Sequence, residues 1–489
     1  MIITTEERNN MKYVKNVLGV LVAVIVLVSA AVFSIWRINP PQADESSPAF
    51  QRMMYNIERF AADVRFPGTP NHAMVRDEII AEIKAMGLTP IIHRTEATVR
   101  DLFEAGLRIR PMQNLDATAS WVQWISENFE DALESNAEYY RNLFPNHPWG
   151  HGGHIYVENI LVTLPATDGS TGGIMFVAHY DTMQYTPGAA DAMTSVAAML
   201  EAMRVHAQSD NLANNIHFLF TDAEEVWALG AFAFSRDFPH LIDEVDMLIN
   251  LEAVGNSGGL LNFQTSDAPH AMISLYNRAV PRPIGFHWGN WVYTTQMPFS
   301  YTDFTVFREY GFAGLNFAIL GGHEHYHTMT DTFENLNRNT AWHYLVTTMA
   351  LADYAANNSL SRLREPSQDA VFFTFLPGNM VVLTVTMANI LMGLAFVAAL
   401  AFLVYRFKSK MQKSLFVTIL LIAQILLTVF ILIFASMLSY LFWIPLLAVS
   451  ISAFLKKWTI VYRSAMVVSG AIVLLLWVPP IYLLFSLFG

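Results

Sequence analysis

The chain has 489 residues, of which 53% are hydrophobic and 14% charged, and its formal net charge is −12. Soluble domains carry roughly a quarter charged residues, so this low share indicates membrane-embedded segments. The acidic balance argues against a nucleic-acid partner, because phosphate contacts need clusters of Lys and Arg. Cysteine is absent, so any metal must be bound by His, Asp and Glu.

The first predicted element is an apolar segment, residues 17–36. Its length of about 20 residues is enough to cross a hydrocarbon core of roughly 30 Å. Basic residues within 1–16 precede it, and the positive-inside tendency predicts that this tail is cytoplasmic. The alternative is a cleaved signal peptide with small residues at 29–31, although the apolar region of such peptides has only about 7 to 15 residues.

Residues 46–365 are predicted to form a soluble domain outside the cytoplasm. From residue 171 the pattern alternates between strands and helices, in the order "GIMFVAHYD", "DAMTSVAAMLEAMRVHA", "NNIHFLFTDAEE", "VWALGAFAFSRDF" and "VDMLINLEAVG". Such alternation predicts an α/β fold with a mostly parallel central sheet and helices on both faces. In these sheets ligands bind beyond the carboxyl ends of the strands.

Two further regions stand apart from this pattern. Residues 95–155 are amphipathic, aromatic and acidic, which predicts a helical insertion over the site or an additional surface layer. Residues 380–489 are largely apolar and predict a C-terminal membrane domain with four spans, at 380–405, 415–435, 438–454 and 464–487. Basic loops between the spans fall on the cytoplasmic side, so we expect an integral protein of the cell membrane.

Ionisable side chains follow the ends of the predicted strands. They are, in chain order, His179, Asp181, Asp191, Glu224, Glu225, Glu252 and His327. Zinc accepts His nitrogen and carboxylate oxygen. Two bound dications would offset the repulsion between the adjacent Glu224 and Glu225, because bound ions reverse the local charge balance. Five of these side chains would complete a site for two Zn²⁺ ions.

The motifs "HYD", "PGAAD", "AEE", "LEAVG" and "YHTMTDT" resemble those of the zinc exopeptidases of the aminopeptidase Y type. Within that family, "NLEAVGNSGGLLNFQTS" and "YTDFTVF" are most similar to the membrane-bound endoplasmic reticulum metallopeptidase branch. The resemblance covers residues 59–357. It implies that His179 and Glu252 bind one zinc, that Glu225 and His327 bind the other, and that Asp191 bridges the two.

The resemblance also implies roles for three neighbouring side chains. Glu224 would be the general base, Asp181 would orient the ring of His179, and Tyr326 would stabilise the oxyanion. Many soluble relatives have Asp where this chain has Glu252, so the affinity for the first metal is an open question. His323 and His325 are alternative ligands, although the "YHTMTDT" frame favours His327.

The resemblance implies a membrane-anchored aminopeptidase that hydrolyses peptide bonds at a free amino terminus. One alternative is a single-zinc acyl transferase of the glutaminyl cyclase type, because a fold alone does not fix a reaction. Metal content would separate these two. The other alternative is a non-catalytic binding ectodomain, which is expected to lose its ligands. All five ligands and the base are present here.

Overall fold

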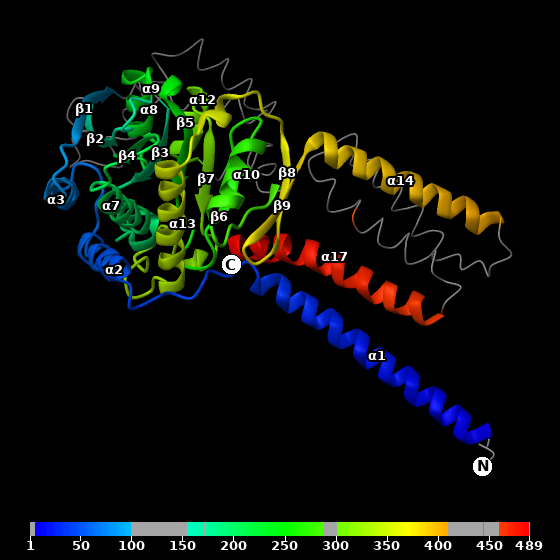
Figure 1. Cartoon of the computed structure of the whole chain (residues 1–489). Helices are drawn as coiled ribbons and strands as arrows, with labels where there is room; N and C mark the ends of the chain where they lie inside the picture. The colour runs from blue at the N-terminus through cyan, green and yellow to red at the C-terminus, as the bar shows by residue number, and fades with distance from the viewer. Residues whose placement is uncertain are drawn as a thin grey trace, which may run out of the picture. The chain divides into compact units, whose positions relative to one another are not determined.

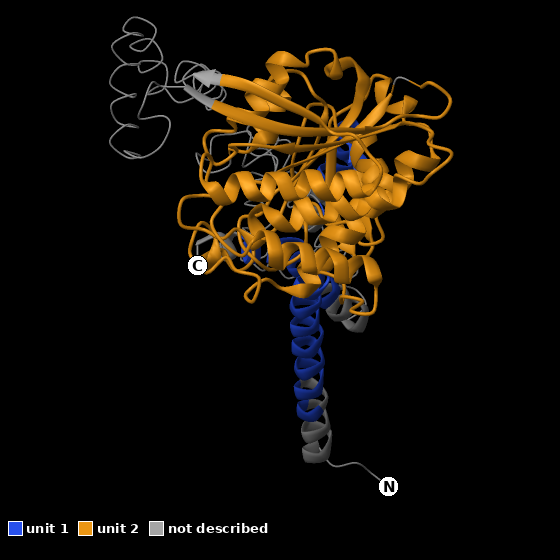
Figure 2. Cartoon of the chain, turned by 90° about the vertical axis from the view of Figure 1, so that its left-hand side faces the viewer, with its two compact units in different colours: residues 1–39, 383–485 blue, residues 40–382, 486–489 orange. Residues whose placement is uncertain are grey.

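The computed structural model describes residues 5–98, 154–170, 172–287, 301–408, 444 and 459–488. The chain divides into two compact units, coloured separately in Figure 2. One comprises Met1–Asn39 and Leu383–Phe485, and the other comprises Pro40–Val382 and Ser486–Gly489. The second unit therefore holds all the residues predicted to form the site.

A seven-stranded sheet with the order β1-β2-β4-β3-β5-β7-β6 forms the centre of the second unit (Figure 1). Its strands are β1 (Ile91–Thr98), β2 (His154–Leu164), β3 (Gly173–His179), β4 (Asn215–Thr221), β5 (Val245–Leu251), β6 (Leu261–Thr265) and β7 (Gly314–Ala318). The four strands β4, β3, β5 and β7 are parallel. The pairings β1–β2, β2–β4 and β6–β7 are antiparallel.

The sheet is therefore mixed, and the prediction of a mostly parallel sheet holds only for its centre. Both β1 and β2 precede residue 171, where the alternating pattern that indicated parallel strands begins. Open sheets with a parallel centre commonly carry antiparallel strands at their edges. The mixed α/β class and the covering helices were predicted correctly.

Helices cover both faces of the sheet (Figure 1). They are α2 (Pro48–Phe60), α3 (Pro70–Ala85), α7 (Ser195–His206), α8 (Leu229–Asp237), α9 (Leu241–Glu244), α10 (His270–Ala279), α12 (Asp303–Glu309) and α13 (Arg338–Asn357). Helices α7 and α13 contact β3 and β4, whereas α8 contacts β1 and β2. A hairpin of β8 (Ala370–Leu376) and β9 (Asn379–Thr384) follows α13.

The alternation of side chains along β3 explains why two apolar cores form. Ile174 and Phe176 are buried in a core with residues of α2, α7 and α13. Met175 and Val177 point to the opposite face and join a second core with residues of α8 and α12. Successive side chains of a strand face opposite sides of a sheet, so β3 is buried on both faces and fixes the position of its carboxyl end.

In the first unit, α1 (Thr5–Trp36), α14 (Val385–Lys408) and α17 (Thr459–Phe488) are the described helices. Among the described residues, one helical segment, Val17–Trp36, is long and apolar enough to cross a membrane. It has 20 residues and a mean hydropathy of 2.9. The predicted anchor at 17–36 coincides with it.

The four predicted C-terminal spans are not supported. The second and third lie outside the described residues, apart from Ile444. The first begins inside β9, where Met380 is buried in the core of the second unit. Within α14 and α17, the apolar stretches found among the described residues are Val385–Val397 and Val467–Leu483.

The predicted helical insertion at 95–155 begins and ends in strands. Residues 95–98 belong to β1, and residues 154–155 belong to β2, with which β1 pairs along its whole length. Residues 99–153 lie outside the described part of the chain. Whether that interior is helical therefore stays a prediction.

Candidate metal centre

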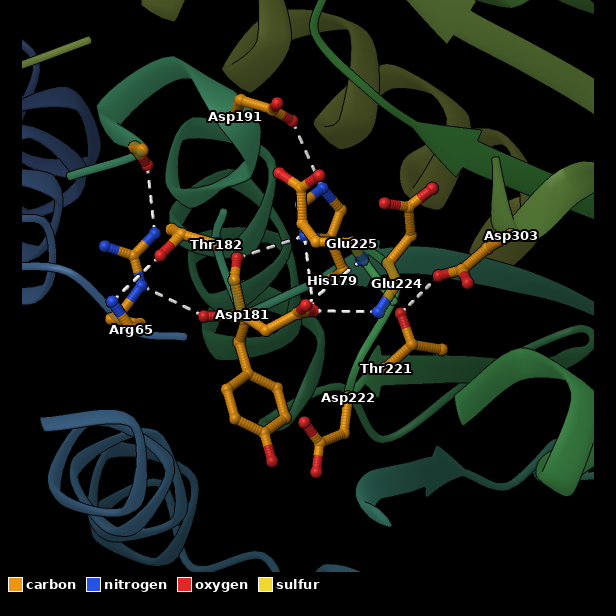
Figure 3. A network of polar contacts seen from close by, with 12 residues as sticks. Arg65, His179, Asp181, Thr182, Asp191, Thr221, Asp222, Glu224, Glu225 and Asp303 are labelled. Carbon is orange, nitrogen blue, oxygen red and sulfur yellow. Dashed lines mark hydrogen bonds and ion pairs between the residues drawn. The ribbon is translucent and has the colours of Figure 1, made fainter. Parts of the chain in front are cut away.

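The parallel strands bring the predicted site residues to one edge of the sheet. His179 is the last residue of β3, Glu252 directly follows β5, and Glu224 is the third residue after β4. Because these strands are parallel, their carboxyl ends meet at the same edge (Figure 3). Asp191 lies in a π-helical turn, Ala189–Thr194, directly before α7, and His327 lies in the loop after β7.

Two groups of His and carboxylate side chains form there. In the first, His179 Nε2 is 3.2 Å from Asp191 Oδ1 and 3.4 Å from Glu252 Oε2. In the second, His327 Nε2 is 3.3 Å from Asp191 Oδ2 and 3.1 Å from Glu225 Oε2. Within each group the possible ligand atoms all lie within 4.8 Å of one another. The groups share Asp191, which presents one oxygen to each histidine.

Asp181 connects the end of β3 to the glutamate pair. One of its carboxylate oxygens accepts a hydrogen bond from the Glu224 amide at 3.0 Å, and the other accepts one from the Glu225 amide at 3.1 Å. His179 Nδ1 is 3.2 Å from the Asp181 carbonyl oxygen and 3.5 Å from Oδ1. The backbones of the two glutamates are therefore fixed together, while their side chains have different neighbours.

Burial and neighbouring charges shift the pKa values of the ionisable side chains in this cluster. Burial, and then the charge of Glu252, raise the pKa of Glu224 well above its usual value. Burial alone would lower the pKa of His179, but Glu252, Asp181 and Asp191 together outweigh it and the pKa is raised well above normal. In the same way, Asp191 and Glu225 outweigh burial and raise the pKa of His327 to about 10. The carboxylates thus carry more negative charge than two histidines neutralise.

The donor atoms fit divalent cations. His nitrogen and carboxylate oxygen are the donors that zinc accepts, and the two groups have the shared carboxylate of a binuclear site. Among the described residues, Glu225 Oε1 is buried without a hydrogen-bond partner. A buried carboxylate oxygen is unfavourable unless a donor or a cation satisfies it, so a cation between Glu225 and His327 would remove this cost.

A cavity of about 170 Å³ opens on the cluster. Its described lining residues are Met183, Asp191, Glu224, Glu225, Trp227, Glu252, Ala253, Val254, Phe263, Tyr301, Thr302, Tyr326 and His327. The ring of Tyr326 stacks on that of His327 with 3.7 Å between centroids. Burial raises the pKa of Tyr326 well above its usual value, so its hydroxyl stays protonated and can donate a hydrogen bond.

The alternative histidines have other neighbours. His323 Nδ1 is 2.9 Å from the Val254 carbonyl oxygen, and His325 Nδ1 is 2.8 Å from Thr330 Oγ1. Neither belongs to the two groups found among the described residues, whereas His327 does. The motif "YHTMTDT", which favoured His327 over the other two histidines, therefore indicated the one that lies beside Asp191.

Sequence reasoning missed a buried arginine that supports the loop before Asp191. The Arg65 side chain is fully buried and donates hydrogen bonds to the carbonyl oxygens of Tyr180 at 2.9 Å and Gly188 at 3.0 Å, and also to that of Pro187 (Figure 3). Burial lowers the pKa of Arg65 to about 10, opposed by nearby carboxylates. The sequence offered only its position before the turn "PG" at 67–68.

Asp331, which is far from Arg65 in the sequence, also supports the loop before Asp191. Its carboxylate accepts hydrogen bonds from the amides of Ala190 at 2.9 Å and Asp191 at 3.1 Å, and its carbonyl oxygen accepts one from Ala189 at 3.1 Å. Burial raises the pKa of Asp331 to about 7. Its place in the motif "YHTMTDT" was the one available sign of importance.

Asn250 orients Glu252, the glutamate that stands where many soluble relatives have Asp. Its side-chain amide donates to Glu252 Oε1 at 3.1 Å and to Asn316 Oδ1 at 2.9 Å. Oε1 is therefore fixed away from His179, and Oε2 is the oxygen that faces it at 3.4 Å. The longer glutamate side chain reaches the cluster because a neighbouring amide orients it.

Fold and side chains together define an α/β protein with a candidate binuclear metal centre at the carboxyl ends of its parallel strands. Residues 159–352 match the model of Peptidase family M28. This match confirms the resemblance to zinc exopeptidases that the motifs carry: residues 159–352 are similar to peptidase family M28.

Curated relatives are membrane proteases. The chain is 29% identical over 225 residues to the vacuolar membrane protease of Candida glabrata, which covers 45% of this chain and 23% of that protein. It is 31% identical over 182 residues to endoplasmic reticulum metallopeptidase 1 of Rattus norvegicus, which covers 37% of this chain and 20% of that protein. The chain thus spans about a quarter or less of the length of these relatives.

Solved structures with a similar course of the chain include two bacterial enzymes. Glutaminyl cyclase of Porphyromonas gingivalis is 18% identical with a TM-score of 0.43, and covers 64% of this chain and 99% of its own. An aminopeptidase of Aneurinibacillus sp. is 14% identical with a TM-score of 0.43, and covers 63% and 93%.

Proposed function

We propose that the protein is a membrane-anchored, zinc-dependent peptidase that cleaves peptides at a free amino terminus. The observation that carries the proposal is the sharing of Asp191 between two His and carboxylate groups, beside Glu224 in an open cavity. The family match supports peptide hydrolysis. The zinc number, the terminal specificity and the substrates are proposals.

His179 and Glu252 would hold one zinc, Glu225 and His327 the other, and Asp191 both. When bound, such ions supply a water of lowered pKa and polarise the scissile carbonyl. Asp181 holds His179 in the orientation that leaves Nε2 directed at the cluster, because its carbonyl oxygen is near Nδ1. The chain thereby orients the ligands before any ion binds.

Glu224 has the environment of a general acid and base. It lines the cavity, and burial and the charge of Glu252 raise its pKa well above the usual value, so this carboxylate binds a proton more readily than an exposed glutamate does. In the proposed reaction Glu224 removes a proton from the attacking water and delivers it to the leaving amine. Tyr326, which stays protonated, donates a hydrogen bond to the oxygen that becomes negative in the transition state.

The acidic lining supports recognition of an amino terminus. Glu224, Glu225 and Glu252 line the cavity, and the described lining residues include no Lys or Arg. With both ions bound, Glu225 and Glu252 would be neutralised as ligands, so the support for an amino terminus lies in Glu224 and in the lack of a cationic partner for a carboxylate among these lining residues. The described residues offer two ligand groups, and this favours hydrolysis over the single-zinc acyl transfer of a glutaminyl cyclase.

Hydrolysis of matched peptides by the purified full-length chain tests this proposal. We expect a free amino terminus to be needed, so acetylation of the same peptides should remove most of kcat/KM. Glu224→Gln should abolish turnover while zinc content is unchanged, because no proposed ligand is altered. Equal cleavage of free and acetylated peptides would contradict the aminopeptidase proposal, and wild-type turnover by Glu224→Gln would contradict the mechanism.

We also propose that α1 anchors the chain with residues 46–365 outside the cytoplasm. Support comes from the basic residues Arg8, Lys12 and Lys15 before the apolar helix. Protease added to sealed right-side-out vesicles should cut the domain at 46–365 and leave the N-terminal tail intact. Cleavage of the tail with protection of the domain would reverse the orientation.

A further inference from the structure

Two loops that carry proposed zinc ligands are joined to each other beside the metal centre. We call residues 252–260, which follow β5, the Glu252 loop, and residues 319–327, which follow β7, the His327 loop. Four backbone hydrogen bonds join them, from the amides of Val254, Asn256 and Ser257 to the carbonyl oxygens of Ile319 (2.9 Å), Gly321 (3.0 Å) and Gly321 (2.9 Å), and from the Gly321 amide to the Ser257 carbonyl oxygen (3.1 Å). The positions of Glu252 and His327 therefore depend on each other.

Glycine is required where the two loops meet. A Cβ atom on Gly255 would clash with the Gly321 carbonyl oxygen, and a Cβ atom on Gly322 would clash with Asn256 Oδ1. Gly322 also has a positive φ of 69°. Only a residue without a side chain allows so close an approach at no steric cost, so these glycines keep the two loops in contact.

The side chain of His323 adds a second connection between the loops. Its Nδ1 lies 2.9 Å from the Val254 carbonyl oxygen, and because a carbonyl oxygen only accepts, Nδ1 carries the proton and donates. The same ring stacks on that of Tyr326, with 5.4 Å between centroids and 25° between planes. Tyr326 in turn stacks on His327, with 3.7 Å between centroids. Ring contacts thus lead from the Glu252 loop to a proposed ligand.

His327 is the proposed ligand that most needs such support. Its φ is 56°, a left-handed conformation that residues with a side chain rarely adopt and that persists only where the surroundings determine it. Its side chain is 29% exposed, whereas those of the other four proposed ligands are 1–5% exposed. The ring of His327 is therefore the least enclosed of the five, and the ring of Tyr326 covers one of its faces.

We propose that His323 is a positioning residue, which fixes Tyr326 and His327 relative to the Glu252 loop. The inference rests on the proposed peptidase function, in which Tyr326 stabilises the oxyanion and His327 binds zinc. Among the described residues, His323 belongs to neither group of possible ligands, so it acts through its two neighbours in the ring stack. Its loss should leave Tyr326 free to turn away from the substrate and His327 less well held.

Release of Zn²⁺ from the full-length protein into a chelator tests the inference without turnover. His323→Ala should release zinc roughly 10-fold faster than the wild type, since groups that orient metal ligands contribute about 10–100-fold to affinity. His323→Phe keeps a ring for Tyr326 but has no donor for Val254, so its release rate should lie between the two. His325→Ala is the matched control, because His325 lies in the same turn but its Nδ1 pairs with Thr330, and it should release zinc at the wild-type rate.

Hydrolysis of a free peptide, with zinc in excess, separates positioning from a general loss of structure. His323→Ala should lower kcat by roughly 10-fold with little change in KM, because the proposed hydrogen bond from Tyr326 forms only in the transition state. In the Tyr326→Phe background the same substitution should lower kcat much less, since the hydroxyl that His323 positions is already gone. A merely structural role would lower kcat equally in both backgrounds.

Zinc release at the wild-type rate by His323→Ala, or equal losses of kcat in the two backgrounds, would overturn the inference. If the wild type hydrolyses no peptide while His323→Ala still releases zinc faster, the proposed function is contradicted and the inference is supported. Robust hydrolysis together with wild-type zinc release would support the function and overturn the inference. His323→Phe gives the same comparisons if His323→Ala does not fold.

Discussion

Two loops supply side chains to the same centre, and they are held in different ways. Residues 187–191, which lead to Asp191, are held by charged side chains from distant parts of the sequence, Arg65 and Asp331. Residues 223–228, which carry Glu224 and Glu225, are held by local backbone hydrogen bonds in a left-handed conformation. The first loop depends on buried ionic groups, whereas the second tolerates strain.

This difference determines how each loop should respond to substitution. Removing a buried charge leaves its partners unsatisfied, so changes behind Asp191 should be costly. In the second loop a residue that accepts positive φ should be favourable, because the strain lies in the backbone.

Arg65→Met should have the largest effect. It removes the donors to at least three buried carbonyl oxygens and a charge that faces the carboxylate cluster. We expect about 3–5 kcal/mol of lost stability and loss of bound zinc, measured by thermal unfolding and metal analysis. The control is Arg59→Met, since Arg59 forms partly exposed ion pairs with Glu78 and Glu82 that are worth about 0–1 kcal/mol. Equal effects of both variants would show that Arg65 is not a special support.

Asp331→Asn should have an intermediate effect. The substitution keeps the shape of the side chain but leaves one oxygen to accept from two amides, those of Ala190 and Asp191. We expect a loss of about 1–3 kcal/mol and faster zinc release into a chelator, because Asp191 would be less well fixed. Zinc release at the wild-type rate would contradict the inference that Asp331 helps to retain the metal by fixing Asp191.

A charged pair precedes the second loop, and it predicts a pH dependence. Burial alone would lower the pKa of His72, but Asp222, at 2.8 Å, outweighs it and the pKa is raised. This contribution to stability is complete below the ordinary pKa of 6.5 and is lost as pH rises through the raised value.

The difference in melting temperature between wild type and His72→Gln tests the pair. This difference should be greatest near pH 6, where it should correspond to about 1 kcal/mol in the free energy of unfolding, and it should shrink towards pH 9. Taking the difference between two proteins removes the titration of groups common to both. A difference that stays constant over this range would contradict a charged His72.

The smallest effect should appear at Trp227, where the usual order of Gly and Ala should be reversed. Because φ is 62°, Trp227→Gly should be more stable than Trp227→Ala by about 0.5–1 kcal/mol. At Tyr185, which has no positive φ, the Ala variant should be at least as stable as the Gly variant. Thermal unfolding of the four variants measures both differences. The same order at both positions would contradict strain in the second loop.

Much of the centre was predictable, because it depends on features that sequence expresses directly. Apolar runs ending in polar residues predicted strands whose carboxyl ends would meet, and His179, Glu224 and Glu252 lie at such ends. The spacing could not give the antiparallel edges, because strand direction depends on partners far away in sequence.

The supports were not predictable for a related reason. Arg65 donates to backbone carbonyl oxygens, which every residue has, so the sequence does not show which of them accept. It is also separated from Gly188 by more than a hundred residues. Hydrophobicity also misled the reading at Met380, since an apolar strand buried in a soluble core has the same composition as the beginning of a membrane span.

The zinc content of the purified full-length protein, measured beside that of the Asp191→Asn variant, is the decisive test of a shared binuclear centre. We expect about two zinc ions per chain in the wild type, because five ligands with one shared carboxylate exceed what one tetrahedral ion uses. We expect Asp191→Asn to lose both ions together, since one oxygen of Asp191 faces each histidine. A single zinc in the wild type, or the loss of only one ion in the variant, would contradict a shared binuclear centre.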